Sequence, residues 1–175
     1  MDASFEILNL TDDGTIPNSK YPVIVYHNAF SMEGDAAADL LQNRFADNGW
    51  TNSFRWKVYD FHHYHSNTHE VLGVYAGNAL LQLGGPHGEK LQVRSGDIMI
   101  LPAGTGHISL SHSSDFQVVG AYPGGVEPDL IKIDDQRQPG IIQKVDAVAV
   151  PSSDPFYGIR QEGIVTSWSE RASRI

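Results

Sequence analysis

The chain has 175 residues, of which 41% are hydrophobic and 10% aromatic, so it can bury the core of one globular domain. The net charge of −9 and the lack of any Lys/Arg cluster argue against a nucleic-acid partner, and no run approaches the ~20 apolar residues of a membrane span. With no cysteine in the chain, disulfides and thiolate metal ligands are excluded.

The first third of the sequence predicts a strand and a helix. The N-terminal segment carries two acids and no basic residue ahead of its short apolar stretch, unlike a secretory signal, so a cytoplasmic location is expected. Residues 21–29 predict a strand whose Pro22 belongs at its start or at a sheet edge. Residues 35–47 predict the one helix, because Leu41 and Phe45 share an apolar face and an Asn-Gly pair follows as a stop.

Beyond the helix, short apolar or aromatic runs alternate with Gly, Pro, Asn or Ser clusters, which is typical of antiparallel strands joined by turns. The predicted strands are 54–65, 70–76, 79–83, 90–94, 98–101, 107–111 and 116–122. Segments 130–133 and 146–150 are expected to pair at a sheet edge, and residues 154–158 to form a turn. So many short strands predict a sandwich or barrel, built by one domain over residues 1–175 with its core at about 52–124.

A histidine-rich motif lies within these strands. Side chains alternate along a strand, so His63 and His65 face one side and Tyr64 faces the other. A polar Ser-Asn-Thr turn follows, and Glu70 opens the returning strand, where its carboxylate can face the same interior. The motif therefore predicts two imidazoles and a carboxylate on one wall of a sheet.

A second segment supplies a third imidazole. A Gly-rich turn within residues 96–107 can bring His107 to the same interior, because glycine permits a tight backbone. Three imidazoles and one carboxylate suit one divalent transition metal, such as Fe, Mn, Ni, Cu, Co or Zn. Four protein ligands leave a coordination position open, as catalytic sites do. The alternative is a hydrogen-bonded polar cluster without a metal.

The two segments contain the patterns His63-x-His65-x4-Glu70-x6-Gly77 and Gly96-x5-Pro102-x-Gly104-x2-His107. These patterns resemble the first and second motifs of the cupin superfamily. Two positions depart from it, because Lys57 stands where the family has glycine and Ser111 where it has asparagine. Neither is a ligand position in the family. Over residues 20–160 the sequence also resembles the YjlB-like branch of single-domain cupins.

The resemblance implies an all-β cupin fold, a double-stranded β-helix or jelly-roll barrel, here with one short N-terminal helix. It implies that His63, His65, Glu70 and His107 hold one divalent transition metal, with Fe(II) as the first choice because many cupins with this ligand set are dioxygenases. Cupins commonly dimerise through their sheets, so a homodimer is expected. The reaction is less well indicated, since the YjlB-like proteins do not share an assigned activity.

Three residues are candidates for catalysis. Glu70 is one, because it is an expected metal ligand and its carboxylate is charged. Tyr59 shares the inward face with His63 and offers a hydroxyl to a substrate, although ordinary core packing is an equal alternative. Gln82 is a polar residue on an otherwise apolar strand, and a buried amide needs a partner, so a role near the metal is a third expectation. Arg55 precedes the ligand strand, where it could hold an anionic substrate.

The remaining histidines are expected to have structural or surface roles. His62 and His69 lie on the opposite strand face from the ligands, although a bulged turn would let His69 assist. His87 is predicted in an exposed hairpin loop, and His27 and His112 at the surface or rim.

Three functions fit the sequence. The first is a non-haem dioxygenase acting on a small organic substrate, and the second is a redox-neutral isomerase, decarboxylase or lyase. The third is a non-catalytic metal-binding or small-molecule-binding protein, which the lack of a DNA-binding domain disfavours. No carboxylate or lysine other than Glu70 is expected clearly inside the barrel, which favours chemistry by the metal itself over proton shuttling.

Overall fold

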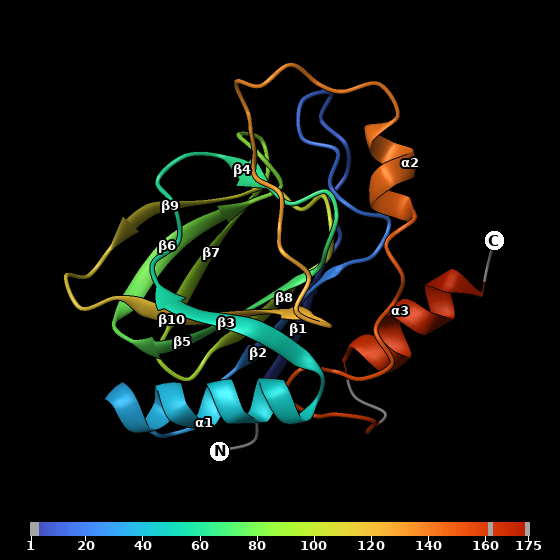
Figure 1. The fold of residues 1–175 in the computed structure, drawn as a ribbon. Coiled ribbons are helices and arrows are strands. Elements are labelled where there is room, and N and C mark those ends of the chain that lie inside the picture. The colour runs from blue at the N-terminus through green and yellow to red at the C-terminus, as the bar shows by residue number, and fades with distance from the viewer. Residues whose placement is uncertain (1–3, 161–162, 174–175) are drawn as a thin grey trace.

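The computed structural model describes residues 4–160 and 163–173, in which strands form two antiparallel sheets (Figure 1). The six-stranded sheet has the order β1 (Ser4–Leu8), β2 (Val23–His27), β8 (Ile98–Leu101), β5 (Glu70–Ala76), β10 (Gln117–Pro123), β3 (Trp50–Trp56). The five-stranded sheet has the order β11 (Ile131–Lys132), β4 (His63–Tyr64), β9 (His107–His112), β6 (Asn78–Leu83), β7 (Glu89–Arg94). Sequence neighbours are often not sheet neighbours, as the jelly-roll prediction requires.

The space between the sheets is the barrel interior. One buried cluster draws side chains from both sheets, including Leu72 and Val118 from the first and Leu81 from the second. In β5, Leu72 shares a face with Glu70 because the side-chain period of a strand is two. Glu70 is therefore carried into the barrel at the beginning of the strand.

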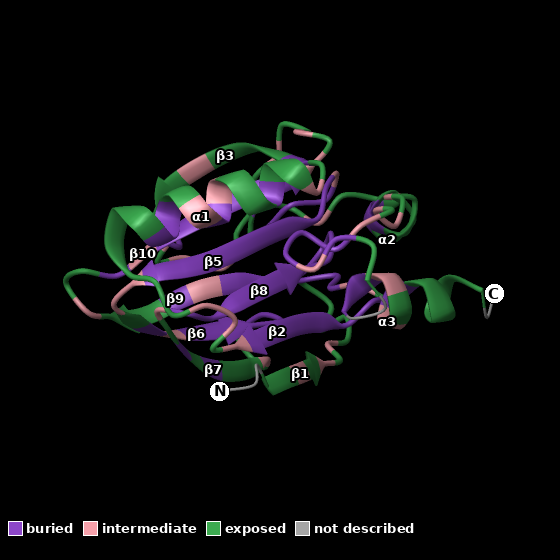
Figure 2. Ribbon diagram, turned by 90° about the horizontal axis from the view of Figure 1, so that it is seen from below, coloured by how far each residue is buried: buried purple, intermediate pink, exposed green. Residues whose placement is uncertain are grey.

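The outer face of the six-stranded sheet is covered by a second apolar layer. Helix α1 (Gly34–Asp47) lies along this face, over strands that are almost wholly buried (Figure 2). The approach is close at Gly73, where an added Cβ would lie 2.8 Å from Leu41 Cδ1. Trp168 of α3 (Ile164–Ala172) is fully buried in the same layer.

The all-β fold class and the helix at 35–47 are confirmed. Strands 70–76 and 98–101 have the predicted bounds, and the bridge between Asp154 and Gly158 closes the predicted turn. The prediction of one helix was incomplete, because the described residues also contain α3 and α2 (Ile141–Asp146).

Two strand predictions were wrong. The expected strand 54–65 is interrupted, since β3 ends at Trp56 and residues 57–62 leave the sheet before β4. Segment 146–150 is not a strand, because Asp146 is the last residue of α2 and the residues after it form a turn and coil. Ile141 and Val145 are buried one helical turn apart, a spacing that favours a helix. Strand β1, which was not predicted, pairs with β2 along its whole length.

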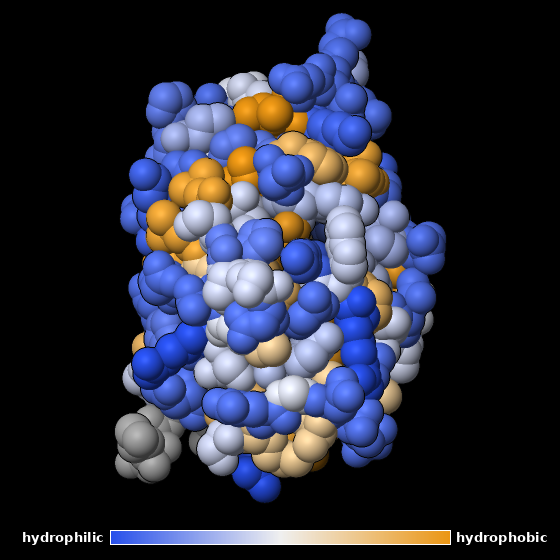
Figure 3. Space-filling model, turned by 90° about the vertical axis from the view of Figure 1, so that its left-hand side faces the viewer, coloured by the Kyte–Doolittle hydropathy of each residue, from blue (hydrophilic) through white to orange (hydrophobic). Residues whose placement is uncertain are grey.

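One face of the molecule is largely polar. Figure 3 shows hydrophilic side chains over most of one face, with hydrophobic ones gathered in its upper half. Among the described residues, no helix has the length and apolar character that a membrane crossing demands.

Candidate metal centre

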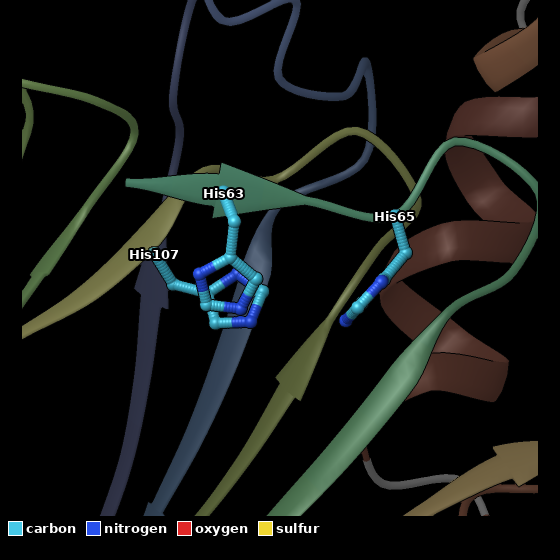
Figure 4. A group of neighbouring side chains, drawn as sticks. All are labelled: His63, His65 and His107. Atoms are coloured by element: carbon cyan, nitrogen blue, oxygen red, sulfur yellow. The ribbon is translucent and has the colours of Figure 1, made fainter. Parts of the chain in front are cut away.

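Three buried histidines converge inside the barrel. His63 of β4 and His107 of β9 are direct cross-strand partners, with ring centroids 4.0 Å apart. His65 follows β4 and projects into the same space (Figure 4). Each offers a ring nitrogen, and these nitrogens all lie within 4.8 Å of one another, so the three histidines can hold a metal ion.

Main-chain carbonyls orient all three rings. The Nδ1 atoms of His63 and His107 lie 3.0 Å from the carbonyl oxygens of Phe61 and Thr105, each two residues earlier. Nδ1 of His65 makes a short contact with the carbonyl of Asp129. A carbonyl oxygen only accepts hydrogen bonds, so each Nδ1 carries the proton and each Nε2 presents a lone pair. That tautomer is the one that binds a metal through Nε2.

Glu70 faces ring nitrogens of two of these histidines. Its Oε2 lies 3.2 Å from Nε2 of His107 and 3.4 Å from Nε2 of His65, yet this buried oxygen makes no hydrogen bond within the described residues. Its other oxygen, Oε1, accepts a hydrogen bond of 3.2 Å from the hydroxyl of Tyr122. A buried carboxylate oxygen without a hydrogen bond, beside two imidazole nitrogens, is a donor arrangement that a cation satisfies.

Burial controls the protonation states of the cluster. Desolvation, with the nearby His107, lowers the pKa of His63 to about 2, so its imidazole is neutral. Burial alone would raise the pKa of Glu70, but the neighbouring His65 and His107 lower it below the usual range. Burial likewise opposes the charge on His65, but Glu70 outweighs it and raises the pKa of that histidine. Glu70 therefore attracts positive charge to this point of the cluster, and a bound cation would supply it.

The cluster forms the floor of a cavity of about 370 Å³. Phe54, Trp56, Val58, Tyr59, Leu72, Tyr122, Pro128 and Leu130 line it together with the charged residues Lys57, Glu127 and Asp129. Of the described carboxylates and lysine that line the cavity, only Glu70 is buried, while Lys57 and Asp129 are half-buried and Glu127 is exposed. The other three groups come from residues 57–62, which leave the sheet, and from the loop after β10.

That loop is fastened to the turn beside His65. The main-chain nitrogen of Ser66 donates to the carboxylate of Asp129 at 2.6 Å, and the hydroxyl of Ser66 makes a short bond to the same group. Asn67 donates to the carbonyl of Glu127 at 2.9 Å and accepts from the main-chain nitrogen of Asp129 at 3.0 Å. These bonds hold the carbonyl that orients His65.

The predicted catalytic residues have different positions. Tyr59 lines the cavity, and its ring centroid lies 5.1 Å from that of His63. Gln82 is not brought to the cluster, because it lies on the face of β6 opposite to the core residue Leu81, and its amide donates to the carbonyl of Pro86 at 3.0 Å. Arg55 also points away from the cavity, toward Gln42 of α1 at 2.9 Å.

The other histidines are outside the cluster. Nδ1 of His69 accepts from the main-chain nitrogen of Ala103 at 2.9 Å, and Nε2 lies 3.0 Å from the carbonyl of Ala149. Its ring also packs on Trp168 at 4.8 Å. His87 is in an exposed loop, as predicted. His27 contacts Glu6 at 2.8 Å, a partner the sequence did not indicate.

Sequence reasoning missed two residues of the site. Tyr122 could have been found, because Phe116, Val118 and Tyr122 share one strand face by the period of two. Asp129 gave no comparable signal, since it orients His65 through a main-chain carbonyl that any residue type would supply.

The fold and the site together define a cupin-type barrel with a buried three-histidine cluster that can hold a metal. No family model matches the sequence. The chain is 40% identical over 158 residues to the uncharacterized protein YjlB of Bacillus subtilis (strain 168), an alignment that covers 90% of this chain and 92% of that protein. The chain therefore belongs to the YjlB family.

Several solved structures are similar at low identity. Acireductone dioxygenase from Bacillus anthracis, with a cadmium ion in its active centre, is 17% identical with a TM-score of 0.40, covering 74% of this chain and 82% of that one. DMSP lyase DddQ from Ruegeria pomeroyi is 14% identical with a TM-score of 0.36, covering 74% and 51%. A Klebsiella pneumoniae protein with a double-stranded β-helix domain is 16% identical with a TM-score of 0.34, covering 75% and 79%. At these scores the similarities carry no argument about function.

Proposed function

We propose that this protein is a metal-dependent cupin enzyme in which His63, His65, Glu70 and His107 hold one divalent transition metal. The observation that carries the proposal is the hydrogen bonding of the cluster. Every Nδ1 bonds to a main-chain carbonyl, while Oε2 of Glu70 faces Nε2 of His65 and of His107 and makes no hydrogen bond to the described residues. Fe(II) is the first choice, and Mn, Ni, Cu, Co and Zn also suit this donor set.

The reaction that we propose is the oxidation of a small organic substrate by dioxygen. A bound transition metal would supply Lewis acidity and, in the case of iron, redox chemistry with dioxygen. Phe54, Leu72 and Tyr122 give the cavity an apolar wall that excludes water and confines an organic molecule. The hydroxyl of Tyr122 fixes the orientation of the Glu70 carboxylate.

A redox-neutral isomerase, decarboxylase or lyase is the second candidate. The observation in its favour is the bond from the hydroxyl of Tyr122 to Glu70, which places a proton donor at the edge of the cavity. Burial and the Glu70 charge both raise the pKa of Tyr122, so this hydroxyl keeps its proton. Such a group can deliver a proton to a substrate anion without any oxidant.

Elemental analysis of the protein purified without added metal, joined to oxygen uptake with catechols and diketones, tests the proposal. Stoichiometric iron with substrate-dependent oxygen uptake is the expected result. Zinc, nickel or manganese without uptake would select the redox-neutral candidate. A protein that holds no metal and refuses added metal would overturn both. The expected homodimer and cytoplasmic location stay predictions from the sequence.

A further inference from the structure

Lys57 lines the cavity above the histidine cluster. Its side chain is half-buried, and among the described residues its ammonium group has no hydrogen bond or ion pair. Lys57 is also the position at which this chain departs from the glycine of the cupin motif, so the charge is a feature of this sequence. A lysine on a cavity wall whose ammonium has no partner among the described residues favours an anion that arrives from outside.

The acids that share the cavity lining with Lys57 already have partners. Oε2 of Glu127 accepts from the side-chain amide of Asn52 at 3.1 Å. The carboxylate of Asp129 accepts from Ser66, and Nζ of Lys144 lies 3.1 Å from it. Lys57 is therefore the charged group of the cavity mouth that is left for a ligand.

The remaining wall of the cavity is apolar or aromatic. Phe54, Val58, Leu72 and Leu130 line it, and the ring of Trp56 packs edge-on against that of Tyr59 at 5.2 Å. A volume of about 370 Å³ is at the small end of ligand pockets. The space fits a molecule about the size of one substituted aromatic ring, with an apolar body and a charged end.

We propose that Lys57 binds the carboxylate of the substrate, which is a small organic monoanion with an aromatic or branched aliphatic body. This inference rests on the proposed function, since it places the opposite end of the same molecule toward the histidine cluster. A monocarboxylate suits one ammonium group. A phosphate dianion would leave a charge unbalanced between Glu127 and Asp129, and among the described residues no arginine lines the cavity to hold it in two places.

Calorimetric titration of the zinc-loaded protein with phenylacetate and with phenylacetamide tests the role of Lys57. The two probes have the same ring and nearly the same shape, but only phenylacetate is charged. Zinc is chosen because it has no redox chemistry. Lys57→Met removes the charge and keeps most of the side-chain volume, and Lys90→Met is the matched control because Lys90 is exposed on β7, outside the cavity lining.

The expected result is that Lys57→Met weakens phenylacetate binding roughly tenfold, as the loss of one charge-assisted hydrogen bond implies, and leaves phenylacetamide unchanged. Lys90→Met should bind both probes as the wild type does. Equal phenylacetate affinity in wild type and Lys57→Met would overturn the inference, and so would failure of phenylacetate to bind the wild type at millimolar concentrations.

Zinc content distinguishes failure of the inference from failure of the proposed function. Wild type and Lys57→Met should both hold one zinc ion, because Lys57 contributes no ligand atom. If both proteins hold one zinc ion and bind phenylacetate with equal affinity, the inference is overturned and the proposed metal site is not. Absence of zinc from the wild type overturns the proposed function, and the same two probes titrated into the metal-free proteins still decide whether Lys57 binds the carboxylate.

Discussion

Buried histidines occupy the two faces of the six-stranded sheet at the start of β5, and the two regions use them differently. Inside the barrel, His63, His65 and His107 each use one ring nitrogen in a hydrogen bond to a carbonyl, and the second nitrogens of His65 and His107 face Glu70. Outside it, His69 uses both nitrogens in hydrogen bonds to the main chain and packs on Trp168. Burial is common to both regions, so burial alone does not mark a metal ligand, and the cluster histidines differ in that a ring nitrogen of each lies within 4.8 Å of the others.

Removal of a cluster histidine should cause the largest loss of metal affinity. We expect His107→Ala to lose more than about 100-fold in metal affinity, beyond the 10- to 100-fold typical of residues that only orient a ligand. Metal content after dialysis, measured by elemental analysis, tests this, with His87→Ala in the exposed loop as the control. Full metal occupancy in His107→Ala would contradict the four-ligand site.

Removal of His69 should lower the stability of the protein and leave its metal content unchanged. His69→Ala deletes two buried hydrogen bonds and the contact with Trp168, so we expect a loss of about 2–4 kcal/mol in the free energy of unfolding. Metal content per folded molecule should stay at the wild-type value. Urea denaturation measures the first quantity and elemental analysis the second, with the exposed His112→Ala as the control. A loss of metal without a loss of stability would make His69 a ligand.

The pH dependence of stability sharpens the same contrast. Burial lowers the pKa of His69 from its ordinary 6.5 to about 4. Between these values the unfolded chain binds a proton that the folded chain does not, so the contribution of His69 to stability is complete above pH 6.5 and falls as the pH drops toward 4. The stability gap between wild type and His69→Ala, from urea denaturation across this range, should therefore narrow on acidification. A constant gap would show that His69 does not titrate differently on folding.

Within the barrel, His65 depends on a loop for its orientation, whereas His63 and His107 depend on residues of their own segments. Asp129→Ala frees the loop from Ser66, so we expect metal affinity to fall about tenfold. Lys144→Met removes only the exposed ion pair to the same carboxylate, and should change affinity by less than about twofold. Competition with a chelator measures both. Equal effects would mean that the bonds to Ser66 do not position the ligand.

Among the residues that orient a ligand, the smallest effect should come from Tyr122, whose hydroxyl donates to Glu70. Tyr122→Phe removes one bond of 3.2 Å and keeps the ring in place, so we expect metal affinity to fall a few-fold, as an ordinary hydrogen bond of about 0.5–1.5 kcal/mol implies. Chelator competition again measures it, with Tyr59→Phe as the control, because Tyr59 contacts His63 through its ring. A loss as large as that of His107→Ala would mean that the hydroxyl itself is essential to the site.

Sequence predicted the parts of the molecule that local pattern controls. Strand β5 and its inward Glu70 follow from alternation after a polar turn, and the cross-strand pairing of His63 with His107 agrees with the two separate motifs. The departure of residues 57–62 from the sheet was not predicted, because their aromatic composition favours a strand. What moves them is tertiary, such as the bond from the main-chain nitrogen of Ser109 to the carbonyl of Tyr59 at 2.9 Å.

The contribution of Asp129 depends on a chain reversal that no nearby residue encodes. Its carbonyl reaches His65 across 64 positions of sequence, through a loop whose anchors are ordinary Ser and Asn side chains. Lys57 was seen only as a departure from a motif, and its place in the cavity lining became visible once residues 57–62 were found outside the sheet.

Because main-chain carbonyls orient the three imidazoles, mutations at the residues that supply these carbonyls do not remove the acceptors. The carbonyl oxygens of Phe61, Thr105 and Asp129 persist whatever side chain each position carries, so no single codon change there deletes an acceptor. Sequences can diverge widely at positions 61 and 105 while the tautomers of His63 and His107 are preserved, whereas at position 129 the side chain also holds the loop. A lineage that keeps the backbone path and the four donor residues can therefore alter the cavity wall, and with it the choice of ligand, without rebuilding the centre.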